Sequence, residues 1–188
     1  MTLYDDAVAA LLLAPEPPRG QVVYSLLLAP SFHPELALHL GDLERTEQPC
    51  SLGVRVADAS IFGYVHAVER MSPQVLRALT PPSVLHQDLT LDLGQTSKLK
   101  DLVEAVVPPV PGPPGRDGMQ LTLVGRGSHA VRHTLSTAEF DPKLPGHAPM
   151  MALAIGLIDT ARAHCTDEPI ARSLLVARSY LADVYGLR

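Results

Sequence analysis

Two histidines four positions apart, His129 and His133, raise the question of a metal-binding or catalytic element. They lie in the stretch GRDGMQLTLVGRGSHAVRHTLS, residues 115–136, directly after a proline cluster. Apolar and polar residues alternate from Met119 to Leu123 before a glycine-containing loop, which predicts a β-hairpin. In its returning strand the histidines share one face but lie roughly 13 Å apart, too far to bind one metal ion. We therefore expect a structural pair, with at least one ring partly buried and hydrogen-bonded.

Other residue types that could carry out chemistry stand alone in the sequence. Ser128 precedes His129, but neighbours in a strand point to opposite faces, and no GxSxG elbow is present. The histidines form no HExxH motif, and Cys50 and Cys165 are isolated, as expected of reduced, buried thiols. We predict no cofactor and no metal ligands, while a convergence of distant histidines in space stays open.

Carboxylates offer a second kind of candidate site. Asp42, Glu44 and Glu47 lie in a polar loop, and acidic side chains accelerate the docking of a basic protein partner. We predict these three as partner-binding residues. Asp88 and Asp92 fall on the same solvent face of a predicted strand, and either set of carboxylates could serve only solubility.

The composition limits the classes of partner. Apolar residues make up 46% of the 188 residues and charged residues 19%, so the chain should fold. Tryptophan is absent and the net charge is −5, which disfavours nucleic acid and anionic membranes. Residues 1–94 hold 5 basic and 11 acidic side chains, against 10 and 9 in residues 95–188. The acidic half could steer a basic partner, although an ordinary solvated face explains it as well.

Targeting signals are not evident in the sequence. The first residues are acidic where a secretory signal would be basic, and the longest uncharged apolar run, HAPMMALAIGLI, is shorter than the about 20 residues that span a bilayer. We expect a cytoplasmic protein without a membrane span.

The first half of the chain mixes helical and strand patterns. Thr2 can cap a first helix that PEPPRG ends, and residues 21–29 are typical of a buried strand. We predict one or two helical turns at 34–44, two short strands within 51–69 joined around 58–60, and a helix at 72–79.

The second half contains clearer patterns. Leucines alternate with polar residues in 84–93, which predicts a half-buried strand, and Ser97 can cap a helix. The prolines of 108–114 predict a stiff extended connector. After the hairpin, residues 148–165 and 167–186 have the composition and spacing of two helices.

These elements predict one α+β domain over residues 1–188. Its mainly antiparallel sheet would use residues 21–29, 51–68, 84–93 and 119–135, with the C-terminal helices packed on one face. The alternative is a division into two lobes near 108–114.

The last part of the chain resembles a known kind of protein. The hairpin, the loop FDPKLPGHAP and the apolar helix after it, together residues 115–165, resemble a module of small bacterial α+β proteins, some of them proposed immunity proteins of polymorphic toxin systems. This chain departs from the pattern because Ala130 to Leu135 lack the aromatic residues often found there. The resemblance implies a protein partner bound through a variable surface, so no functional residue carries over.

Three functional classes follow from these observations. The first is a protein-binding protein of immunity or accessory type, and the alternative is a small-molecule binder or sensor with an aliphatic pocket. A hydrolase or metal enzyme is third, because no catalytic motif is present. Homo-oligomerisation and strand order stay open.

Overall fold

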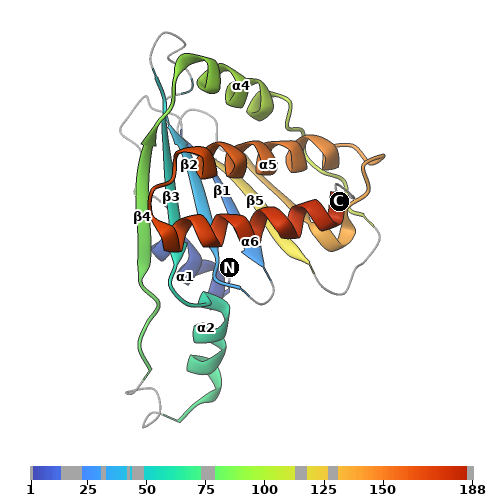
Figure 1. The fold of residues 1–188 in the computed structure, drawn as a ribbon. Helices are drawn as coiled ribbons and strands as arrows, with labels where there is room; N and C mark the ends of the chain where they lie inside the picture. Colours follow the sequence, from blue (N-terminus) through green and yellow to red (C-terminus); the bar gives the residue numbers. More distant parts are fainter. Residues whose placement is uncertain are drawn as a thin grey trace.

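An antiparallel sheet organises the chain (Figure 1). The computed structural model describes residues 2–13, 23–30, 33–41, 43, 49–72, 79–112, 118–126 and 131–185. Within these ranges the strands are β1 (Val23–Pro30), β2 (Leu36–Gly41), β3 (Ser51–Ala57), β4 (Val84–Thr90), β5 (Met119–Arg126) and β6 (Val131–Ser136). Their order in the sheet is β4-β3-β2-β1-β5-β6. Because β1 pairs with β5, strands from both sides of the proline connector 108–114 belong to this sheet.

Helices lie on both faces of the sheet (Figure 1). Their bounds are α1 (Leu3–Leu12), α2 (Ile61–Arg70), α4 (Leu93–Glu104), α5 (His147–His164) and α6 (Glu168–Tyr185), with a 3-10 turn, η1 (Thr137–Glu139), after β6. Helices α4, α5 and α6 cover one face, whereas α1 lies on the other and α2 extends beyond the end of the sheet. The predicted α+β class, with C-terminal helices on one face of an antiparallel sheet, is confirmed.

The main core fills the space between the sheet and α5 and α6. Alternate residues of the strands point toward these helices because side chains alternate with period two. Fully buried members include Leu26, Leu28, Leu36, Leu38, Leu40, Leu52, Met150, Leu153, Leu174 and Leu181. Each large aliphatic side chain buried in this way contributes about 1.5–3 kcal/mol of transfer free energy.

A smaller core lies under α1 and α2. It contains Val8, Leu12, Leu27, Ala37, Ala57, Ile61 and Val65. Helix α1 begins as predicted, because Thr2 and Asp5 form a reciprocal capping box. This face of the sheet is therefore also partly buried from solvent, which the sequence did not predict.

Two elements of the first half were predicted wrongly. Residues 36–41 form strand β2 instead of helical turns, because β1 and β3 pair with both of its edges. Residues 61–70 form helix α2 instead of a strand: the Ser60 side chain accepts a hydrogen bond from the N–H of Gly63 at 3.1 Å and so caps the first turn. The strand predicted over 51–68 therefore ends at Ala57.

The remaining predictions differ mainly at element ends. Strand β4 stops at Thr90, and Asp92 is not a strand residue but the N-cap of α4, so this helix begins before Ser97. The β5–β6 hairpin and both C-terminal helices are confirmed. Residues 73–78 of the helix predicted at 72–79 lie outside the described ranges.

Candidate functional site

A buried polar pair lies between the two central strands, on the α1 side of the sheet. Ser25 and His39 are register partners on β1 and β2, and Ser25 Oγ lies 2.8 Å from His39 Nδ1. Ser25 is fully buried, and the His39 side chain is 7% exposed. A hydroxyl beside an imidazole is the arrangement that activates a serine nucleophile, so its surroundings decide what the pair can do.

The second ring nitrogen of His39 fixes the direction of these hydrogen bonds. His39 Nε2 lies 2.8 Å from the carbonyl oxygen of Leu12, which can only accept, so Nε2 donates. Nδ1 of the neutral ring then accepts from the Ser25 hydroxyl. Burial lowers the pKa of His39 to about 4, and the nearby Arg55 and Arg126 guanidinium groups act in the same direction. His39 is therefore neutral at pH 7.

The pair holds the end of α1 against the sheet. Ser25 Oγ accepts a hydrogen bond from Arg126 Nη2 at 3.3 Å, and Arg55 Nη1 donates to the carbonyl oxygen of Leu13 at 3.3 Å. Two carbonyl groups that the end of the helix leaves without helical partners are thus satisfied by side chains of the sheet. With its hydroxyl fully buried, Ser25 cannot contact a substrate in this conformation, and the geometry supports a structural role.

Glu35 forms a second buried polar centre next to α2. Its carboxylate is 1% exposed and accepts backbone hydrogen bonds from Ile61 at 2.7 Å and Phe62 at 2.8 Å. The hydroxyl of Tyr4 donates to the same carboxylate at 3.2 Å. Burial and the Glu35 charge raise the pKa of Tyr4. An anion at a helix N-terminus is favourable, so Glu35 fixes the start of α2 and the backbone of Phe62.

Phe62 presents its ring to solvent from this fixed backbone. The side chain is 54% exposed. The rings of Tyr4 and Phe62 pack edge to face, with their centroids 5.8 Å apart. The His66 ring stacks on Phe62, with a centroid distance of 5.7 Å. We call Tyr4, Phe62 and His66 the aromatic cluster. Contacts of this kind restrict the Phe62 ring without burying it.

A surface hollow adjoins the aromatic cluster. Its volume is about 310 Å³, and it is lined by Tyr4, Ala29, Pro30, Phe62, Gly118 and Gln120. A smaller hollow of about 100 Å³ shares Tyr4, Ala29 and Gln120 with it and continues along α1 to Asp5 and Arg132. Together the two hollows form a groove between α1 and the face of β1 and β5, whose lining is mainly apolar and includes the oppositely charged Asp5 and Arg132.

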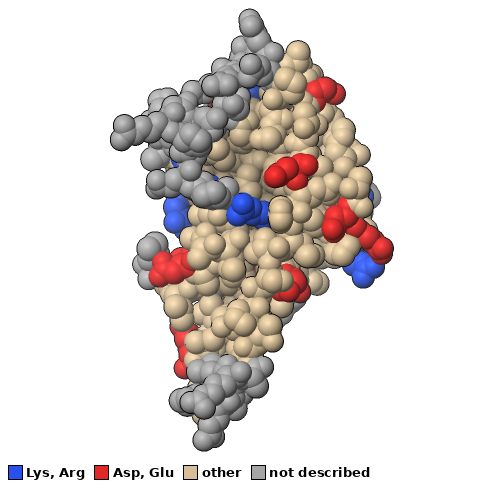
Figure 2. Space-filling model, turned by 90° about the vertical axis from the view of Figure 1, so that its left-hand side faces the viewer, with Lys and Arg blue, Asp and Glu red and all other residues tan. Residues whose placement is uncertain are grey.

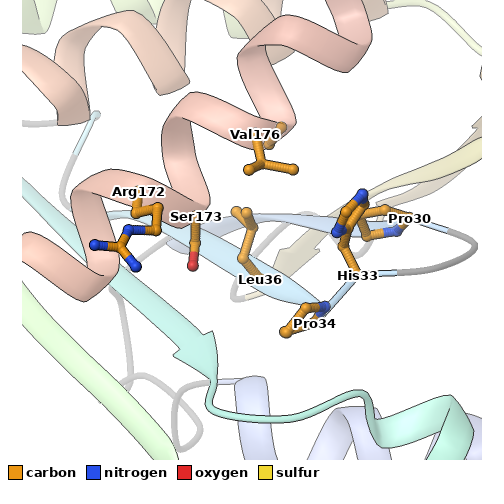
Figure 3. Close-up of a pocket in the computed structure, with 8 residues that line it drawn as sticks. Pro30, His33, Pro34, Leu36, Arg172, Ser173 and Val176 are labelled. Atoms are coloured by element: carbon orange, nitrogen blue, oxygen red, sulfur yellow. The ribbon is translucent and has the colours of Figure 1, made fainter.

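A separate pocket of about 190 Å³ lies on the opposite side of the sheet, between α6 and the start of β2 (Figure 3). Leu36 and Val176 point toward each other there, and the His33 ring lies beside them. Arg172 is at the rim and forms an ion pair with Glu168 at 3.0 Å. This pocket is largely aliphatic, and it is smaller than the about 300–1,000 Å³ typical of sites for drug-sized ligands.

The predicted partner-binding residues cannot be compared with this geometry. Asp42, Glu44 and Glu47 lie outside the described ranges, as do Ser128 and His129. Because His129 is among these residues, the distance between His129 and His133 stays a prediction.

His133 and the cysteines are described. His133 is half-buried on β6 opposite Leu123, as expected for one histidine of the pair, and its predicted hydrogen bonds stay a prediction. Cys50 is buried and Cys165 is half-buried, and neither forms a disulfide bond, in agreement with the prediction of reduced thiols.

Neither a metal-binding cluster nor a membrane-spanning helix is found in the described part of the chain. No group of three or more His, Cys, Asp or Glu side chains there could hold a metal ion. No helix in those ranges is both long and apolar enough to cross a membrane.

On the side that contains the β4 edge, the described charged side chains are scattered singly or in small groups between uncharged areas (Figure 2).

Comparison with protein families, with curated proteins and with solved structures finds no match to this chain.

Sequence reasoning did not identify the residues of these sites. The position of Glu35 was a weak indication of a buried carboxylate, because it directly precedes the mainly apolar residues 36–40. Tyr4 and Phe62 carried none, since helical spacing places aromatic residues in cores as often as on surfaces. Ser25 and His39 are brought together by strand register, which the sequence leaves open.

Proposed function

We propose that this chain is a protein-binding protein whose main contact surface is the aromatic cluster with the adjoining groove. The observation that carries the proposal is the Phe62 ring, 54% exposed and yet held by Tyr4 and His66. Aromatic residues of this kind, next to a hollow that a partner side chain can fill, are typical of the residues that dominate binding energy.

The network beneath the cluster supports this role. Glu35 accepts the N–H groups of Ile61 and Phe62 and the Tyr4 hydroxyl, so α1, β2 and α2 are fixed relative to one another. A surface that is ordered before binding loses less conformational entropy when the partner docks. The buried Glu35 therefore serves binding indirectly, by positioning Phe62.

Charge suggests a basic partner. The chain carries a net charge of −5, and its acidic half, residues 1–94, contributes both helices of the aromatic cluster. Four acidic residues surround the cluster, since Asp5 and Asp6 lie in the first turn of α1, Asp58 precedes α2 and Glu69 lies near its end, and they outnumber the basic Arg70 on α2 and Arg132 at the groove. Complementary charge accelerates docking and favours partners of the opposite sign. The immunity-type function expected from the sequence is the specific form of this proposal, with a basic toxin domain as partner.

Affinity capture from native cell extract tests the proposal. The baits are the wild-type chain, Phe62→Ala, and Leu93→Ala as a matched control, because Leu93 is 51% exposed on α4. A basic protein retained by wild type and Leu93→Ala, lost with Phe62→Ala and eluted by salt supports the proposal. Equal capture by all three baits contradicts it. A further bait with Asp42, Glu44 and Glu47 replaced by their amides tests whether the predicted loop extends the surface.

The second candidate function is small-molecule binding in the aliphatic pocket of Figure 3. Its favouring observation is the apolar lining of Leu36 and Val176 beside the polar His33 and Ser173. A volume of about 190 Å³ admits a small apolar group rather than a large cofactor. Native mass spectrometry of the purified chain tests this function: a bound mass retained by wild type and lost with Val176→Phe, which fills the pocket, would favour it.

A further inference from the structure

Strand β4 forms one edge of the sheet. It pairs with β3 on one side, and no element of the described structure lies beyond it in Figure 1. Its sequence is VLHQDLT. Figure 2 shows the molecule from the side of this edge, where the charged residues among those described are scattered between uncharged ones. An edge strand is a template for pairing with another strand, and natural proteins protect such edges when pairing is not wanted.

The backbone of β4 offers hydrogen-bonding groups at alternate residues. Leu91 N donates to Cys50 O, and Asp58 N donates to Ser83 O, each at 3.0 Å. Because Leu91 and Ser83 bond to the β3 side, the odd-numbered residues between them face β3. The N–H and C=O groups of residues 84, 86, 88 and 90 therefore point away from the sheet.

This alternation limits how two copies of β4 can pair antiparallel about a twofold axis. Hydrogen-bonded pairs must join even-numbered residues of the two strands. One register places His86 opposite itself, where neither ring meets a carboxylate, and another places the two Asp88 carboxylates opposite each other, which is unfavourable. The register between them, centred on Gln87, places His86 opposite Asp88 of the other copy, and does so twice.

We propose that this chain self-associates through β4, in the register centred on Gln87, so that the sheets of two copies become continuous. The same register pairs Leu85 with Leu89 on the face that carries α5 and α6. On the other face it places Asp88 of one copy beside His86 of the second, whose neighbour on β3 is Arg55. The sequence of this edge is thus complementary to itself in one register.

A seven-residue strand supplies a small interface. Interfaces below about 1,200 Å² are typical of weak or transient association. We therefore expect a monomer–dimer equilibrium that depends on concentration, independent of the aromatic cluster on α1 and α2.

Cysteine cross-linking tests the register. Directly opposite residues in a hydrogen-bonded antiparallel pair have Cα atoms about 5.5 Å apart, within the range that a disulfide spans. In a Cys165→Ser background, a mixture of His86→Cys and Asp88→Cys chains should form a disulfide-linked dimer under mild oxidation. His86→Cys alone, and His86→Cys mixed with Thr90→Cys, report the slipped registers and should not cross-link.

Charge exchange tests the same contact without cross-linking. Sedimentation velocity over a concentration series should show a dimer for wild type and an at least roughly tenfold higher dissociation constant for His86→Asp, which sets carboxylates opposite each other. Adding Asp88→Lys to His86→Asp restores opposite charges and should restore the dimer. Circular dichroism checks that each variant folds. A wild-type chain that stays monomeric throughout, or a His86→Asp chain that dimerises as well as wild type, overturns the proposal.

Discussion

Ser25 and His39 stand directly opposite each other on β1 and β2, with 2.8 Å between Ser25 Oγ and His39 Nδ1. The ring is neutral, and its other nitrogen holds the carbonyl of Leu12 at the end of α1. The pair resembles a catalytic dyad in its atoms but is enclosed by the structure it stabilises. The pair should therefore affect stability before it affects any chemistry.

Acidification should destabilise the chain through His39. Its pKa is about 4 in the folded state and 6.5 ordinarily, so the unfolded chain binds more protons between these values. The stability is complete above about pH 6.5 and falls as the pH drops toward 4. We expect wild type to lose about 3 kcal/mol more than His39→Gln between about pH 7.5 and about pH 4. Urea unfolding at several pH values measures this difference.

Two carboxyls have a separate effect at lower pH. Hydrogen bonds from Thr2 lower the pKa of Asp5, and those from Ser83 lower the pKa of Asp58. Because both pKa values lie below 3.8, the stability these groups supply is lost only in more acidic solution.

The His39 prediction has a clear contradicting result. If wild type and His39→Gln lost equal stability between about pH 7.5 and about pH 4, the lowered pKa of His39 in the folded chain would be excluded.

Glu35 and Tyr4 should be energetically coupled. Glu35→Ala leaves the N–H groups of Ile61 and Phe62 without the carboxylate and should cost about 3 kcal/mol. Tyr4→Phe keeps the ring contact with Phe62 but removes the hydroxyl, at a cost of about 1 kcal/mol. In the Glu35→Ala background the second substitution should cost almost nothing. A double-mutant cycle by chemical denaturation measures the coupling, and additive costs would show that the 3.2 Å contact contributes no stability.

Gly146 should tolerate no side chain. It precedes α5 with a φ of 82°, and a Cβ there would lie 2.6 Å from Pro109 Cα. Gly146→Ala should therefore destabilise the chain by about 2 kcal/mol or more. Gly63→Ala is the matched control: its Cβ would meet Ser60 at an ordinary 3.6 Å, and alanine favours the helix, so stability should stay equal or rise. Thermal unfolding of both variants makes the comparison.

The sequence predicted elements better than their arrangement. The hairpin was predictable from local alternation, because its strands are neighbours in the chain and side chains alternate within each. Strand β2 was missed although Leu36, Leu38 and Leu40 alternate with smaller or polar residues. Alanine, leucine and glutamate favour helices in isolation, and the pairing with β1 and β3 overrides that preference.

The candidate site depended on contacts that no local pattern encodes. Phe62 and Tyr4 meet because Glu35 joins α1 to α2, and the three residues come from distant parts of the chain. Helix α2 itself was missed because the β-branched and aromatic residues of 61–65 favour strands, whereas the Ser60 cap and the burial of Ile61 and Val65 one turn apart stabilise a helix.

The affinity of Phe62→Ala for the captured partner tests the central claim most directly. Isothermal titration should give an at least roughly 30-fold weaker dissociation constant than wild type, the loss expected for an anchor worth about 2 kcal/mol. Leu93→Ala and His133→Ala should bind within about twofold of wild type. Equal affinities for wild type and Phe62→Ala, with both chains folded, would contradict a binding surface built around the aromatic cluster.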